Sequence, residues 1–151
     1  MRILHTLTVM FIGSFIIQYF LMSSIMANRM ENITNSLGKV YLSIIMGLYM
    51  MGIEIMMHDH HYGVFSIKYY IFIGILLGLF IYLYRAQKYI TDNQYLEEMI
   101  EHHSMALLTS NKILEKTDNY NVSKIAKNII QKQEDEIKEM KGILKNLQNK
   151  K

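Results

Sequence analysis

The C-terminal half contains a short stretch in which thioether and imidazole side chains recur at helical spacing. Met99 precedes His102 by three residues and His103 by four, so on a helix these side chains share one patch. Thioethers are soft ligands that select Cu(I), and imidazole also accepts copper. The spacing predicts a copper site. The alternative is that His103 is a packing histidine, hydrogen-bonded to a partner such as Gln133.

A second stretch downstream could complete that site. Gln133, Glu136 and Met140 follow one another at intervals of three and four, which places them on adjoining parts of one helix face. If the two helices are antiparallel, this face meets the histidine pair. The alternatives are ordinary ones: Met99 and Met140 pack in a core, and Glu136 is a solvated charge.

Another metal-ligand cluster lies near the middle of the chain. It consists of Met57, His58, His60 and His61, preceded by Glu54 in a long apolar run. If that run continues as a helix, then Glu54, Met57 or His58, and His61 line one face, which could hold a metal at a membrane surface. The alternative is a polar turn between two membrane spans.

Several chemistries are excluded by composition. With no cysteine, the chain has no disulfide, no thiolate ligand for zinc and no thiol nucleophile. It lacks a glycine-rich phosphate loop and an H-E-x-x-H motif. Di-iron bundles repeat Glu-x-x-His pairs, whereas here Glu98 precedes His102 by four residues and the other helix has no such pair. The chain has no long basic run, so we do not expect nucleic acid as a partner. We therefore expect a non-enzymatic protein with a copper ion as its one cofactor.

The elements that position these residues follow from charge and hydropathy. Residues 1–84 hold four of the 16 basic and three of the 13 acidic residues, although the mean hydropathy of the whole chain is only +0.11. We predict a membrane region over residues 1–88, with spans at about 3–27, 40–58 and 67–85. A cleaved signal peptide is the alternative for the first span. Residues 89–151 form a soluble domain.

The soluble domain reads as a helical hairpin. Thr91 and Gln94 match a capping box, apolar residues then recur every three or four positions, and a polar stretch at 115–121 separates a second periodic run. Two amphipathic helices leave apolar stripes uncovered. We therefore expect a homo-oligomer, in which two hairpins complete a four-helix bundle.

These motifs resemble the domain-of-unknown-function 305 family over about residues 92–147. The matching patterns are M-I-x-H-H-S-x-A-x-x-T-S and I-I-x-x-Q-x-x-E-I-x-E-M. The resemblance implies a ferritin-like helical fold, here in a small membrane-anchored subgroup, and copper or silver binding outside the cytoplasm. The resemblance implies that the metal ligands are Met99, His102, His103 and Met140, with Gln133 and Glu136 as supporting residues. The sequence departs from the family at Thr109, where soluble members have a further methionine.

Two functions follow from these observations. The first is a membrane-anchored protein that binds Cu(I) for sequestration or tolerance, with the lipid bilayer and the metal ion as its partners. The second is an interaction module whose hairpin mediates oligomerisation without metal. The charges flanking the spans mildly favour a cytoplasmic C-terminal half. The family resemblance implies a hairpin outside the cytoplasm, and that is the placement we expect.

Overall fold

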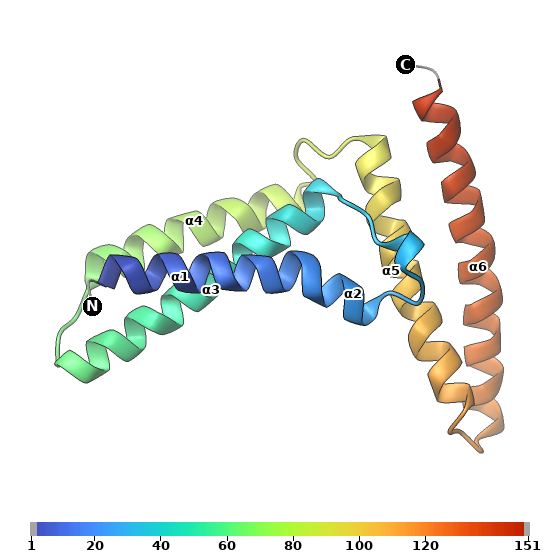
Figure 1. Ribbon diagram of the computed structural model, residues 1–151, viewed down its shortest axis with the longest axis horizontal. Coiled ribbons are helices and arrows are strands. Elements are labelled where there is room, and N and C mark those ends of the chain that lie inside the picture. The colour runs from blue at the N-terminus through green and yellow to red at the C-terminus, as the bar shows by residue number, and fades with distance from the viewer. Residues whose placement is uncertain (1–2, 150–151) are drawn as a thin grey trace. The chain divides into compact units, whose positions relative to one another are not determined.

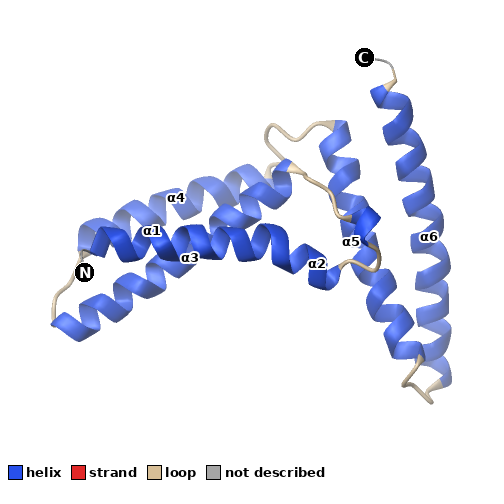
Figure 2. Ribbon diagram, in the orientation of Figure 1, coloured by secondary structure: helices blue, strands red, loops and turns tan. Residues whose placement is uncertain are grey.

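The computed structural model describes residues 3–149, and that part of the chain consists of helices and their connections (Figure 1). Figure 2 shows no strand among the described residues, which confirms the predicted all-α fold. In chain order the helical segments are α1 (Ile3–Ile16), the π-helical turn η1 (Ile17–Leu21), α2 (Met22–Met26), the 3₁₀ turn η2 (Met30–Asn32), α3 (Leu37–Tyr62), α4 (Ile67–Arg85), α5 (Asp92–Leu114) and α6 (Tyr120–Gln148).

The chain folds as two compact units. Among the described residues, the first unit contains 3–22 together with Leu37–Ile90, and the second contains Ser23–Ser36 together with 91–149. The second unit thus includes a segment that lies between the first two apolar helices in sequence.

Three helical stretches are long and apolar enough to cross a membrane: Ile3–Met26, Leu37–Tyr62 and Ile67–Arg85. The first stays continuous because the π turn η1 joins α1 to α2 without a break. The second is longer than the predicted 40–58, since the histidine-rich stretch continues the same helix to Tyr62. The condition set for the second ligand cluster, a helix running through it, is therefore met.

The first unit has a small interior and a large apolar exterior. Leu7, Leu48, Ile55 and Ile73 form the buried core between α1, α3 and α4. Outside it, large apolar side chains such as Leu4 and Ile75 are 65% and 66% exposed. Only 6% of the apolar window in the first helix and 28% in the second are buried. A surface of this kind is stable where an apolar medium covers it.

Helices α1 and α3 approach each other closely at Gly47. A Cβ atom on Gly47 would lie 2.7 Å from the Phe11 ring and 3.2 Å from the Phe11 carbonyl oxygen. Because one of these neighbours is backbone, a larger side chain would force the two helices apart. Glycine at this position therefore sets the distance between α1 and α3.

Gly47→Ala is expected to destabilise the first unit by about 1–3 kcal/mol, the usual cost of overpacking a close contact. Thermal unfolding in detergent, followed by helical circular dichroism, measures the effect. Gly52→Ala is the matched control, since it lies on the same helix and an added Cβ meets nothing within 4 Å. Equal melting temperatures for the two variants would show that the close approach is not constraining.

The turn between α3 and α4 is fixed by two local devices. Gly63 takes a φ of +62° and ends α3, while the N–H of Val64 donates to the carbonyl of Asp59 at 3.1 Å, as in a Schellman cap. The buried Asp59 carboxylate accepts from the Ser66 N–H at 2.6 Å and from its hydroxyl at 2.7 Å. Asp59 therefore anchors the start of α4.

The second unit is built on the predicted hairpin of α5 and α6. Thr91 and Gln94 form the expected capping box at the start of α5, and Asn119 caps α6 by accepting from the N–H groups of Asn121 and Val122. The buried core between the helices is made of Ile100, Leu107 and Ile137, against which Ile130 and Met140 pack. Apolar periodicity thus predicted both helices and the face along which they meet.

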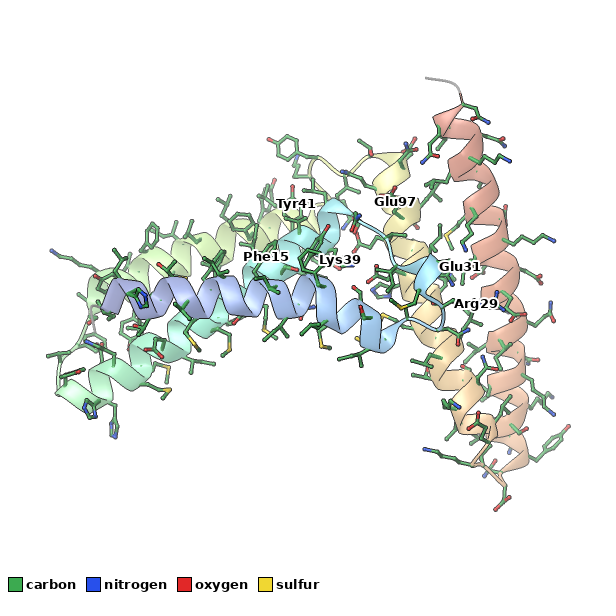
Figure 3. All side chains as sticks on the ribbon, in the orientation of Figure 1. Phe15, Arg29, Glu31, Lys39, Tyr41 and Glu97 are labelled. Carbon is green, nitrogen blue, oxygen red and sulfur yellow. The ribbon has the colours of Figure 1, made fainter. Side chains whose placement is uncertain are left out.

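Residues 23–36, here called the strap, cover part of α5. The hydroxyl of Ser104 is fully buried and accepts from the Asn28 N–H at 2.9 Å and from Nδ2 of Asn32 at 3.2 Å. Glu101 accepts from the Ser23 hydroxyl and from the Thr34 N–H. The strap supplies a third layer from within the chain. In Figure 3 two of its residues, Arg29 and Glu31, are labelled beside the hairpin.

Candidate metal centre

His103 lies where α5 faces α6, and both of its ring nitrogens have partners. Nδ1 is 2.7 Å from the Met99 carbonyl oxygen, one turn earlier on α5. Nε2 is 2.8 Å from the Glu136 carboxylate on α6. His103 is 20% exposed and Glu136 is 51% exposed, so the pair sits at the rim of the helix interface. Of the predicted set, His103 and Glu136 are thus brought together by the tertiary fold.

The protons in this arrangement can be counted. A carbonyl oxygen only accepts, so the Nδ1–H of His103 donates to Met99, and that bond fixes the tautomer. In the neutral ring Nε2 then carries a lone pair that points at a carboxylate, which also only accepts. At 2.8 Å the two atoms lie at hydrogen-bond distance, so one proton lies between them, and a metal ion could replace that proton only if the two side chains moved apart. A histidine held through Nδ1 to a backbone carbonyl is a common arrangement among metal ligands.

Gln133 orients the carboxylate. Its side-chain amide donates to the same Glu136 oxygen that faces His103, at 3.4 Å. The packing alternative for His103 expected a partner such as Gln133, and the structure instead places Glu136 directly against the ring. Gln133 contacts Glu136 and not the ring.

The remaining hairpin residues lie in different surroundings. His102 is exposed, because it lies one residue before His103 and therefore about 100° away from it around the helix. Met99 is partly buried and contacts His103 through its carbonyl. Met140 packs against the core of Ile100, Leu107 and Ile137. All six of these hairpin positions stay predictions as metal-site residues.

The mid-chain cluster lies at the C-terminal end of α3. Met57, His60 and His61 are exposed, whereas His58 is partly buried and its Nδ1 lies 3.3 Å from an Asp59 oxygen. Across residues 3–149, no three histidine or acidic groups lie close enough together to hold a metal ion. At either cluster a third ligand would have to be a thioether, an exogenous group or a side chain in another rotamer.

Two acidic residues that sequence analysis did not single out hold the strap on α5. The Glu101 carboxylate accepts the strap bonds, and the Glu97 carbonyl accepts the Thr34 hydroxyl at 2.6 Å. Burial raises the pKa of the Glu97 carboxyl above its usual range, because desolvation disfavours the charged form. Glu97 is labelled in Figure 3. No spacing signal marks these contacts, because their partners lie more than 60 residues away.

Comparison with known proteins gives two findings. Residues 83–151 match the family described as "Domain of unknown function (DUF305)". The chain is also 34% identical over 143 residues to a protein of Acanthamoeba polyphaga mimivirus described as "Uncharacterized protein L153", covering 93% of each chain. No solved structure matches. An alignment of this length extends through most of the apolar helices, so the similarity is not confined to the hairpin. The chain therefore belongs to the domain-of-unknown-function 305 family.

Proposed function

We propose that this protein is a membrane-anchored, non-enzymatic metal-binding protein that holds Cu(I) in its hairpin and serves in copper sequestration or tolerance. The observation that carries the proposal is the pairing of His103 Nε2 with Glu136 at 2.8 Å while Nδ1 is committed to a carbonyl. A cation that replaced the proton of this pair would bind between the two helices, once the two side chains had moved apart. Met99 lies one turn from His103 and offers the soft thioether that Cu(I) prefers.

The membrane part of the proposal is supported by the three apolar helices and by the strap. The strap and the hairpin belong to one compact unit, so they must lie on the same side of a membrane. The two intervening helices, α3 and α4, supply the even number of crossings that this requires. A chain that crosses three times is therefore consistent with its own folded contacts.

The test is the metal stoichiometry of the full-length protein in detergent under Cu(I), with Cu(II), Zn(II) and Fe(II) as comparisons. The wild type is expected to take up Cu(I) tightly, and the His102→Ala/His103→Ala double variant is expected to lose this uptake while keeping its helical content. His5→Ala/His60→Ala is the matched control, because it removes two exposed histidines of the first unit that neither proposed ligand set contains. Equal Cu(I) uptake by all three proteins would refute the hairpin site.

We also propose that the hairpin lies outside the cytoplasm. Because the chain has no cysteine, single cysteines report accessibility without background. In intact cells, a membrane-impermeant maleimide is expected to label Lys124→Cys on α6 and to spare Phe65→Cys in the α3–α4 turn, which lies across the membrane from it. Both native residues are exposed, so burial cannot explain a difference. The reverse labelling pattern would place the hairpin in the cytoplasm.

The second candidate function is an interaction module, favoured by two observations. Both ring nitrogens of His103 are already satisfied inside the hairpin, as expected of a structural histidine. In addition, Val122, Ile125 and Ile143 on α6 are 40%, 59% and 41% exposed. In this function a second copy covers these side chains and completes a four-helix bundle. The metal-dependent measurements in the Discussion separate the two functions.

A further inference from the structure

The C-terminal end of α3 carries a second set of donor groups that the hairpin proposal does not use. Glu54, His58 and His61 follow one another at steps of four and three residues, which places them on one face of the helix. Together with Ile3 and Thr6 from the start of α1, they line an open hollow of about 480 Å³. One helix face therefore presents a carboxylate and two imidazoles to the same space.

His58 is prepared for metal binding by its neighbour. Its Nδ1 lies 3.3 Å from Oδ1 of Asp59, so Nδ1–H donates to the carboxylate and Nε2 keeps its lone pair. Asp59 is itself held by two donors of Ser66, at 2.6 and 2.7 Å. A carboxylate that fixes the ring of a metal-ligating histidine is a frequent second partner in metal sites. Asp59 therefore positions His58 without being a ligand.

Glu54 supplies an independent reason for a cation. It is the one Asp, Glu, Lys or Arg residue in the 19 positions between Lys39 and Asp59, within a helix long and apolar enough to cross a membrane. Among the described residues, Glu54 has no ion-pair partner. A carboxylate in such a segment is costly unless it is neutralised or paired. A bound dication would neutralise it.

We propose that Glu54, His58 and His61 bind a divalent transition-metal ion of borderline softness, with Zn²⁺ as the representative, and that Asp59 is the positioning residue. Imidazole nitrogens and a carboxylate oxygen are the ligand set such an ion accepts, in contrast to the thioether and imidazole of a Cu(I) site. Met57 shares this face but offers a thioether, which suits Cu(I) better than an ion of borderline softness. His60 lies about 120° round the helix from Glu54 and is left out of the ligand set.

The three side chains reach one point through a rotamer change. In the structure the three side chains do not converge. Among residues 3–149, no group of three histidine or acidic side chains lies close enough together to hold a metal ion. His61 is exposed at the end of the helix, and its ring contacts Tyr62 at 4.8 Å between centroids, as the His58 ring does at 4.7 Å. An exposed imidazole changes rotamer at little cost. The site is therefore assembled when the ion binds.

The experiment measures Zn²⁺ binding and the visible absorption of Co²⁺ on the full chain in detergent. His58→Ala and Glu54→Gln are each expected to weaken Zn²⁺ binding at least about tenfold. Asp59→Asn is expected to weaken it about 10–100-fold, which is the usual effect of losing such a partner. Asp59 also anchors α4, so Ser66→Ala, which removes one of the two hydrogen bonds of that anchor, is measured beside Asp59→Asn. Circular dichroism checks that each variant keeps its helices.

Two controls make the outcome decisive. His60→Ala removes an imidazole from the same hollow but from another helix face, and it is expected to leave Zn²⁺ affinity unchanged. His102→Ala/His103→Ala is also expected to keep Zn²⁺ binding at α3. A failure of the Zn²⁺ proposal and a failure of the Cu(I) proposal are therefore separate results. The proposal is overturned if the wild type takes up no Zn²⁺, or if Glu54→Gln and His58→Ala bind Zn²⁺ as tightly as His60→Ala.

Discussion

Replacing Ser104 with valine is expected to lower the free energy of unfolding of the second unit by about 3 kcal/mol. The Ser104 hydroxyl is fully buried and accepts from the Asn28 N–H and from Nδ2 of Asn32. Valine offers no acceptor, so two donors lose their partner and an extra methyl group must fit into a filled site. Orphaned buried donors cost about 1–3 kcal/mol each, and overpacking adds to this cost.

Asn32 makes the strap particularly sensitive to this change. Asn32 is 3% exposed, its Oδ1 lacks a hydrogen-bond partner, and its Nδ2 donates to the Ser104 hydroxyl. Losing this hydrogen bond leaves the whole buried amide unsatisfied. The strap is therefore expected to detach from α5 before the hairpin itself unfolds.

Amide hydrogen exchange and thermal unfolding measure the Ser104 prediction. Exchange is expected to accelerate at Asn28 and Thr34, whose N–H groups the strap contacts protect. Thr109→Val is the matched control on the same helix, because the Thr109 hydroxyl is exposed and bonds only to carbonyls of its own turn. If Ser104→Val and Thr109→Val exchange and melt alike, the strap does not stabilise the unit.

Removing the His103–Glu136 pair is expected to have a small effect on stability without metal and a large effect with Cu(I). Exposed pairs of this kind contribute about 1 kcal/mol or less, and Glu136 is 51% exposed. A bound ion adds stability according to its concentration over the dissociation constant, about 2.7 kcal/mol at a hundredfold excess. His103→Ala is expected to abolish that gain, and Glu136→Gln to reduce it.

A double-mutant cycle in thermal unfolding, with and without Cu(I), makes this measurement. Gln131→Ala serves as the control, since Gln131 is exposed on α6 and bonds to Asp135 on its own helix. The interaction module gives a different pattern: the cycle shows the same coupling in both conditions, and the variants lose the dimer when their mass is measured by light scattering. Cu(I)-dependent coupling without loss of mass would exclude that function.

Much of the fold could be predicted because it depends on local sequence. Apolar runs without charge fix the long helices of the first unit, and three-and-four spacing with a capping box at Thr91 fixes the hairpin. The predicted span ends at 58, and the sequence left open whether His58, Asp59, His60 and His61 form a turn or continue the helix. Their own helix continues until Gly63 adopts a left-handed conformation and ends it.

The candidate site was predicted only in part, for a physical reason. Spacing along a helix shows which side chains share a face, and it correctly placed His103 toward α6. It does not show which residue of the facing helix meets that ring, because this depends on how far the two helices slide along each other. That offset selected Glu136 rather than Gln133.

The sequence by itself determined the architecture of apolar helices followed by an amphipathic hairpin. It also determined the family and a set of candidate metal-site residues. Only the tertiary structure decided that the link between the first two apolar helices is a strap on α5, and that one histidine of the pair faces a carboxylate. Hydrophobic patterning acts over neighbouring turns of one helix. Hydrogen bonds between groups more than 60 residues apart form only when the whole unit has folded, and they leave no periodic trace in the chain.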